Sequence, residues 1–153
     1  IYVQWNTNNN FTALNYWHYN LEYTEEKNRG YNSNEDVYIC GKFNLHESAL
    51  LVKNAKTVIS HDTGFLYIAC AFHKKTVAIW GATSPALQVE PYYPTDSIHT
   101  EWYYNAIVPN LPCQPCSNYG TKQCPQGHFA CMKKQDLQSI ADKAIAYFKA
   151  TMD

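Results

Sequence analysis

The sequence predicts an α/β domain in which helices flank a parallel β-sheet, and two patterns support this fold class. A β-branched run at residues 57–60 and an apolar run at residues 76–80 are separated by a short apolar segment at residues 65–72 that contains alanines. Strand, helix and strand in this order form a βαβ unit, which requires parallel strands. An amphipathic pattern over residues 136–152 adds a helix that can cover the sheet.

The segment before this unit has a different composition. Residues 1–36 are rich in asparagine, tyrosine and tryptophan and contain few aliphatic residues. Asparagine clusters favour turns. We therefore expect residues 1–36 to be an irregular segment of loops, with one short helix around residues 15–23 and no opening strand. The folded domain is expected to span residues 37–153.

From Val37 onward the pattern becomes regular. Residues 37–40 predict a short strand. Asn44 can cap a helix whose third residue is Glu47, which is typical of a capping box. This helix is expected to end near Asn54 and to turn four apolar side chains towards the core: Leu45, Ala49, Leu50 and Val52.

The remaining elements complete the domain. Residues 81–96 contain three prolines and predict a loop, residues 106–108 predict a short strand, and residues 113–131 form a cysteine-rich loop. One apolar face of the last helix should pack on the core. The residues of this face are Leu137, Ile140, Ala141, Ala144, Ile145 and Phe148.

Length and charge exclude several classes of function. The chain has 153 residues and a formal net charge of −1, so we expect one domain and no electrostatic attraction to nucleic acid. No run of 18 apolar residues is present, which argues against a membrane span. The first residues lack the basic start and apolar core of a signal peptide, so a cytoplasmic location is expected.

The polar cluster Asp62-Thr63-Gly64 is the strongest candidate for a binding site. It follows the first strand of the βαβ unit and precedes the helix, so it lies at the carboxyl end of the sheet, where doubly wound folds bind ligands. A helix N-terminus there attracts phosphate through free backbone amides and the helix dipole. The alternative is that Asp62 only caps the helix.

The same three residues also occur at the catalytic centre of aspartic proteases. Those enzymes need two aspartates that share a proton, so a chain of this length would have to dimerise. Their fold is all-β, whereas Phe65 here opens a helical segment. The protease interpretation is therefore disfavoured.

The order of several motifs resembles glycosyltransferase family 9, the heptosyltransferases of lipopolysaccharide synthesis. The family pattern D-T-G-x-x-H-x-A-x-A, an apolar strand, G-x-T-x-P and a Pro-Tyr pair is matched over residues 62–92. The segments GKFNLHESALLVKNAK and CQPCSNYGTKQCPQGHFACM extend the resemblance, which covers residues 37–148. One position departs from the pattern, because Tyr67 stands where the family has histidine. Tyrosine can hydrogen-bond a phosphate but carries no positive charge.

The resemblance implies a Rossmann-like fold similar to the C-terminal, donor-binding domain of a GT-B glycosyltransferase. It implies transfer of a heptose-like sugar from an ADP-sugar to a lipopolysaccharide-type acceptor, in the bacterial cytoplasm or at the inner membrane face. An N-terminal domain outside this chain would supply the catalytic base, and catalysis would require no cofactor. The implied substrate-binding residues are His61, Asp62, Thr63, Gly64, Tyr67 and Thr83, with no catalytic residue in this chain.

Aromatic and ionisable neighbours of these motifs are weaker candidates. Trp80 and Tyr92 are expected either to pack near the nucleotide base or to fill the core and the loop. His46 and Glu47 open the helix before the βαβ unit at the same end of the sheet, and Glu47 is better explained as part of the cap.

Four cysteines form a second constellation, at positions Cys113, Cys116, Cys124 and Cys131. Four thiolates with a close first pair suit a tetrahedral structural Zn²⁺, with His128 as a substitute ligand. The second pair is wider than in a zinc ribbon, so the alternative of free or variably paired thiols is favoured over a metal site. Cys40 and Cys70 lie in apolar segments and are expected to be buried. A non-catalytic nucleotide-binding or zinc-stabilised interaction module is the alternative function.

Overall fold

The computed structural model describes residues 2–7, 10–15, 37–38, 43–91 and 101–151, and the chain forms a mixed six-stranded sheet of order β3-β2-β1-β4-β5-β6. Strands β4, β5 and β6 are parallel neighbours, β1 runs antiparallel to both β2 and β4, and β3 is parallel to β2. The strands are β1 (Tyr2–Thr7), β2 (Asn10–Asn15), β3 (Val37–Tyr38), β4 (Thr57–His61), β5 (Lys75–Ile79) and β6 (Tyr103–Ala106). The helices are α1 (Leu45–Asn54), α2 (Gly64–Ala71), the 3₁₀ turn η2 (Pro85–Leu87), α4 (Ala130–Lys133) and α5 (Leu137–Lys149).

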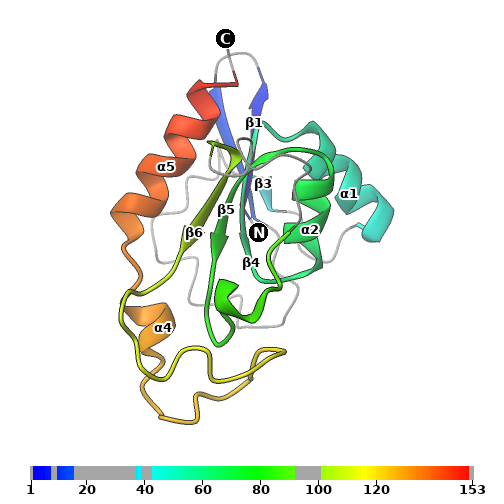
Figure 1. Cartoon of the computed structure of the whole chain (residues 1–153). Helices are drawn as coiled ribbons and strands as arrows, with labels where there is room; N and C mark the ends of the chain where they lie inside the picture. The colour runs from blue at the N-terminus through cyan, green and yellow to red at the C-terminus, as the bar shows by residue number, and fades with distance from the viewer. Residues whose placement is uncertain (1, 8–9, 16–36, 39–42, 92–100, 152–153) are drawn as a thin grey trace.

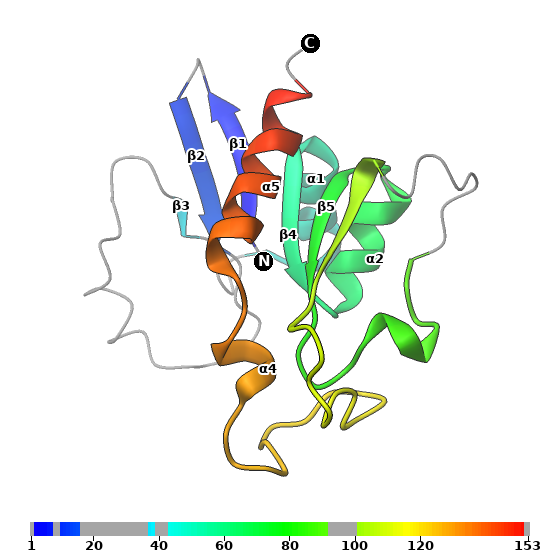
Figure 2. The ribbon, with the colours of Figure 1, turned by 60° about the vertical axis from the view of Figure 1, so that its left-hand side comes forward.

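The predicted βαβ unit is confirmed. Strand β4 pairs with β5 in parallel register from Thr57–Lys75 to His61–Ile79, and α2 connects them. Helices α1 and α2 lie on one face of the sheet and α5 on the other (Figures 1 and 2). The chain therefore has the Rossmann-like α/β fold that the sequence predicts, with a parallel core of three strands and flanking helices.

The core forms where helices meet the parallel strands. On one side, Val58 packs with Val52, Phe65 and Ala69. On the other, Val77 packs with α5 residues including Ile140 and Ala144. A third cluster, around Leu66 and Trp80, also contains Cys70, Ala78 and Tyr103. These fully or nearly fully buried residues fix β4 and β5, whose carboxyl ends carry the polar loops.

The prediction for the N-terminal segment is wrong at residues 2–7 and 10–15, which form strands β1 and β2 rather than loops. Aromatic and β-branched residues such as Tyr2, Val3, Trp5 and Phe11 favour strands even between asparagines. Pairing of β1 with β4 joins this hairpin to the main sheet. The predicted helix at 15–23 falls largely outside the described residues, and the predicted strand at 37–40 is described only as Val37–Tyr38.

The helix faces are partly mispredicted. In α1 the buried residues are Ser48 and Val52, whereas Leu45 and Leu50 are 60% and 56% exposed. Leu50 precedes Val52 by two residues, which turns it by about 200° to the opposite side of the helix.

In α5 the buried face comprises Ile140, Ala144, Tyr147 and Phe148, so Leu137, Ala141 and Ile145 lie outside it. The last strand is also shifted, because Tyr103–Ala106 rather than residues 106–108 pairs with β5. None of the helices in the described part of the chain has the length and apolar character needed to cross a bilayer.

Candidate functional site

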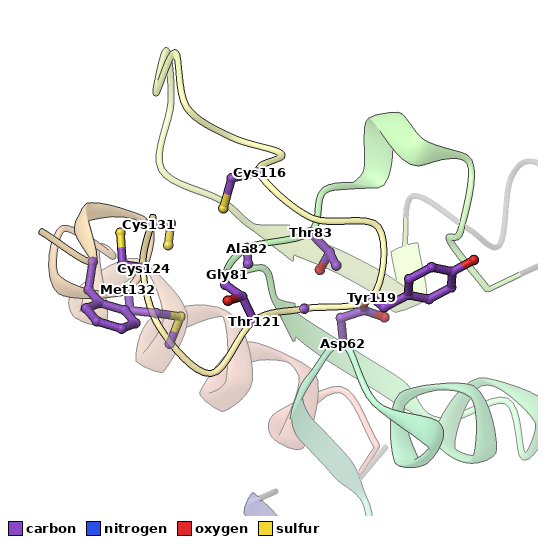
Figure 3. Close-up of a pocket in the computed structure, with 12 residues that line it drawn as sticks. Asp62, Gly81, Ala82, Thr83, Cys116, Tyr119, Thr121, Cys124, Cys131 and Met132 are labelled. Carbon is purple, nitrogen blue, oxygen red and sulfur yellow. The ribbon is translucent and has the colours of Figure 1, made fainter. Parts of the chain in front are cut away.

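A pocket of about 200 Å³ lies at the carboxyl ends of β4 and β5, between the Asp62 turn, the Gly81–Thr83 loop and the cysteine-rich loop. Figure 3 shows Asp62 and Tyr119 on one side of it, and Cys124, Cys131 and Met132 on the other. Its lining residues are Asp62, Gly81, Ala82, Thr83, Cys116, Tyr119, Gly120, Thr121, Cys124, Phe129, Cys131 and Met132. Of the predicted substrate-binding residues, Asp62 and Thr83 line this pocket. The other four do not line it: His61, Thr63 and Gly64 are neighbours of Asp62 in the sequence, and the Tyr67 hydroxyl lies 3.4 Å from the Asp62 carboxylate.

The first turn of α2 is open. Its N-cap residue is Thr63, in extended conformation, and the Thr63 side chain makes no capping hydrogen bond to the helix. The Thr63 hydroxyl lies 3.4 Å from the Ser60 hydroxyl instead. A Cβ built on Gly64 would meet no heavy atom within 4 Å. The alternative role of Asp62 as the helix cap is therefore wrong, because Thr63 occupies that position and Asp62 lies one residue before it.

Tyr67 connects this turn to the loop after β5. Its hydroxyl donates to the Val89 carbonyl at 2.6 Å and lies 3.4 Å from Oδ1 of Asp62. Burial raises the pKa of the Tyr67 phenol, and the neighbouring Asp62 charge raises it further. Tyr67 therefore stays a neutral hydrogen-bond donor at physiological pH.

His61 is the last residue of β4 and is only partly accessible. Burial lowers the pKa of its imidazole, and a hydrogen bond with the Ile79 backbone opposes that shift. Because the neutral form is favoured, His61 does not supply a positive charge for a phosphate at neutral pH. Glu47 belongs to the cap of α1: its carboxylate accepts from the Asn44 amide at 2.8 Å. His46 is exposed in the first turn of the same helix.

The loop that carries Thr83 is held from the cysteine-rich side. The Gln114 side-chain amide donates to the carbonyls of Gly81 at 2.7 Å and Thr83 at 3.1 Å. The Ala82 carbonyl accepts from the backbone amides of Cys116 at 2.9 Å and Ser117 at 3.2 Å. Thr83 is 4% exposed, so its backbone and hydroxyl form a fixed wall of the pocket.

Of the four predicted metal-binding cysteines, Cys113, Cys116 and Cys124 lie on one loop, and Cys131 lies in the short helix α4 that follows it. All but Cys113 line the pocket. Backbone amides of the 126–129 turn, with Phe129 first, lower the pKa of the Cys124 thiol. Burial raises the pKa of Cys131, and the neighbouring thiols of Cys116, Cys124 and Cys113 raise it further. Within the residues that the structure describes, no group of three or more His, Cys, Asp or Glu side chains is arranged to hold a metal ion. The zinc site stays a prediction. His128, the predicted substitute ligand, accepts a hydrogen bond from the Ala130 amide through Nδ1 at 3.0 Å.

Among the aromatic candidates, Trp80 is a core residue. It is fully buried, and its indole N–H donates to Oδ1 of Asn105 at 2.6 Å. Tyr92 lies outside the described residues. Sequence reasoning missed Tyr119, which lines the pocket and is 98% exposed. The signal available in the sequence was a tyrosine followed by a glycine, between Cys116 and Cys124, in a loop with little apolar content.

Comparison with known proteins gives the family. A family model described as glycosyltransferase family 9 (heptosyltransferase) matches residues 16–123, which is more than half of the chain. Lipooligosaccharide heptosyltransferase 2 of Haemophilus influenzae is 39% identical over 49 residues, which are 32% of this chain and 14% of that protein. This chain thus aligns with only a small part of the relative's length. No solved structure gives a significant match.

Proposed function

The chain belongs to glycosyltransferase family 9, and from this premise we propose that it is the donor-binding part of a transferase. The donor would be a nucleotide diphosphate sugar such as an ADP-heptose, and the acceptor a lipopolysaccharide-type saccharide. The alignment with a lipooligosaccharide heptosyltransferase supports this class of substrates. The remainder of the enzyme, including an N-terminal domain of GT-B type, would lie outside this chain.

The open amino end of α2 is the observation that carries the proposal. A helix N-terminus without a side-chain cap and without an acidic residue in its first turn can accept the diphosphate through its backbone amides. The absence of a Cβ at Gly64 leaves space for an oxygen to approach the backbone. The diphosphate would therefore lie over Thr63 and Gly64.

Asp62 and Thr83 would hold the part of the donor that enters the pocket. A carboxylate accepts hydrogen bonds from sugar hydroxyls and repels phosphate, so we place the sugar rather than the diphosphate next to Asp62. The exposed ring of Tyr119 would stack on the base or cover the sugar. His61 would contribute as a neutral hydrogen-bonding group at the rim.

The chemistry of this half is stabilisation of the leaving group. As the glycosidic bond to the diphosphate breaks, negative charge grows on the phosphate oxygens, and fixed backbone dipoles stabilise that charge more strongly in the transition state than in the bound donor. Activation of the acceptor hydroxyl would need a general base. We assign that role to a group outside this chain.

Titration with ADP and with an ADP-sugar, followed by NMR amide shifts, tests the site. Because the proposal places part of the enzyme outside this chain, we expect the affinity of this chain for ADP to be about 1 mM, or ~4 kcal/mol. Shifts should centre on Thr63, Gly64 and Thr83 and should diminish in a folded Thr63→Val, Gly64→Val variant. Shifts centred elsewhere, or none at saturating ligand, would contradict the proposal and leave a fold without the binding function.

For the cysteine-rich loop we propose a structural zinc ion held by Cys113, Cys116, Cys124 and Cys131. The placement of three of these cysteines on one pocket wall supports it. A zinc ion would require the loop to bring the sulfurs to Zn–S distances near ~2.3 Å. Metal analysis of protein purified without chelator tests this. A metal-free, folded sample with four free thiols would reject it.

A further inference from the structure

Tyr67 makes a tertiary contact that a donor-binding residue would not need. It lies in the first half of α2 and is 40% exposed, yet its hydroxyl reaches a carbonyl 22 residues away in the chain. The contact joins α2 to residues 85–91, the segment that follows Thr83. Val89 itself packs against the cluster around Leu66 and Trp80.

The geometry also decides where the phenolic proton goes. A hydroxyl has one proton to donate, and two acceptors compete for it: the Val89 carbonyl at 2.6 Å and Oδ1 of Asp62 at 3.4 Å. The shorter contact is a good O–H···O hydrogen bond and the longer one exceeds the normal range. The proton therefore lies on the side of Val89, and Asp62 keeps its lone pairs available.

The segment after β5 is thus held at several points around the pocket. Gln114 and the Cys116 amide hold residues 81–83 from one side. At the other end Glu90 accepts from the Asn105 side-chain amide. Between these anchors, the Val89 carbonyl accepts a direct hydrogen bond from the Tyr67 hydroxyl of α2, the helix whose first turn would receive the diphosphate.

We propose that Tyr67 is a positioning residue for the donor site: its hydroxyl ties residues 85–91 to α2, which fixes the spacing between the Thr83 wall and the open helix end and leaves Asp62 free for the ligand. The binding consequence rests on the proposed function, whereas the tie itself is a property of the free protein. A site whose walls are already placed loses less conformational entropy when the ligand binds.

Replacement of Tyr67 by phenylalanine removes one oxygen and keeps the ring. Tyr104→Phe is the matched control, since Tyr104 is a half-buried tyrosine on β6. In the free, isotope-labelled chain we expect Tyr67→Phe, and not Tyr104→Phe, to change the Val89 carbonyl ¹³C shift and to speed amide exchange at residues 88–90. ADP affinity should fall roughly three- to ten-fold, the equivalent of one ordinary hydrogen bond.

The two proposals can fail separately. A Val89 carbonyl shift and exchange rates that match those of the control would overturn the role of Tyr67, whether or not ADP binds. An altered Val89 shift with unchanged ADP affinity at Thr63 and Gly64 would also overturn it, because the tie would then not position the site. If Tyr67→Phe changes the Val89 shift but the wild-type protein binds no ADP, the donor site is rejected and Tyr67 makes only a structural contact.

Discussion

Helices α1 and α2 lie on the same face of the sheet, but their first turns are built differently (Figure 1). In α1, Asn44 accepts from the Glu47 amide at 3.0 Å and the Glu47 carboxylate accepts from the Asn44 amide at 2.8 Å. In α2, Thr63 makes no such bond, no acidic residue follows in the first turn, and Gly64 faces open space.

The difference separates a structural helix end from one that is available to a ligand. Satisfying the orphan amides of a first turn stabilises a helix, and α1 uses its own side chains to do so. The first turn of α2 lacks that stabilisation, although the residues on the other side of the helix are buried in the core and hold it in place. An uncapped end on a well-packed helix is the arrangement expected of an anion site, and the following predictions test that comparison.

The largest effect should come from Gly64→Val. Its side chain would fill the space above the first turn of α2, so ADP binding should fall at least about ten-fold, or ~1.4 kcal/mol. Since a Cβ at this position meets no atom, the free energy of unfolding should change by less than ~0.5 kcal/mol. Isothermal titration and urea unfolding measure the two quantities.

Equal losses of binding and stability in Gly64→Val would mean that Gly64 is needed for folding rather than for the ligand. Asn44→Ala provides the matched control for binding, because it alters the other first turn on the same face of the sheet.

Asn44→Ala should lower the stability of the fold and leave ADP binding unchanged, which is the opposite of the result expected for Gly64→Val. Loss of the capping box leaves amides of α1 unsatisfied, and the free energy of unfolding should fall by about 1 kcal/mol. ADP affinity should stay within the error of wild type, since the Asn44 side chain bonds the α1 backbone. Urea unfolding at neutral pH checks the first statement. A loss of ADP binding without a loss of stability would break the distinction between the two helix ends.

The comparison also shows what the sequence could predict. The cap at Asn44 and Glu47 and the unit β4-α2-β5 depend on local patterns, and both were predictable. The openness of α2 was not predictable, because an aspartate and a threonine before a helix normally read as caps. Only the structure shows that the Thr63 side chain makes no capping hydrogen bond and that its hydroxyl lies next to Ser60 instead.

Long-range contacts explain most of the remaining errors. Strand β1 pairs with both β2 and β4, and this pairing overrides the turn preference of the asparagines in β1 and β2. Likewise, nothing local in the segment around Gln114 indicates that its side chain would hold Gly81 and Thr83, 33 and 31 residues earlier in the chain. The cysteine-rich loop was recognised as a metal candidate, but not as a wall of the pocket.

A smaller effect is expected from Gly64→Ala. Alanine reduces the conformational freedom of the unfolded chain, and its Cβ meets no atom in the folded chain. The free energy of unfolding should therefore rise by about 0.5 kcal/mol. The added methyl group should still weaken ADP binding, because it stands where the diphosphate approaches. Thermal unfolding with and without ADP measures both changes. A more stable variant that also binds ADP more tightly would show that the space at Gly64 is not used by a ligand.

The smallest effect concerns α5, a third helix end that, like α1, carries its own cap. Asp136 accepts from the Ser139 hydroxyl at 2.6 Å and from the Ser139 amide at 3.0 Å, and these bonds lower the pKa of its carboxyl. Because the folded pKa lies below the unfolded value of about 3.9, the stabilisation is fully present above that value and is lost as pH falls through the folded pKa.

Asp136→Asn keeps a good cap without the charge. The urea midpoint of wild type should therefore differ slightly from that of the variant at neutral pH, and the two midpoints should converge in acid. Thr63→Ala changes no titratable group, and its urea midpoints should run parallel to those of wild type across the same pH range. If the urea midpoints of wild type and Asp136→Asn still differ by the same amount below about pH 2, the charge of Asp136 contributes nothing to its cap. Helix α5 would then be capped by neutral hydrogen bonds alone.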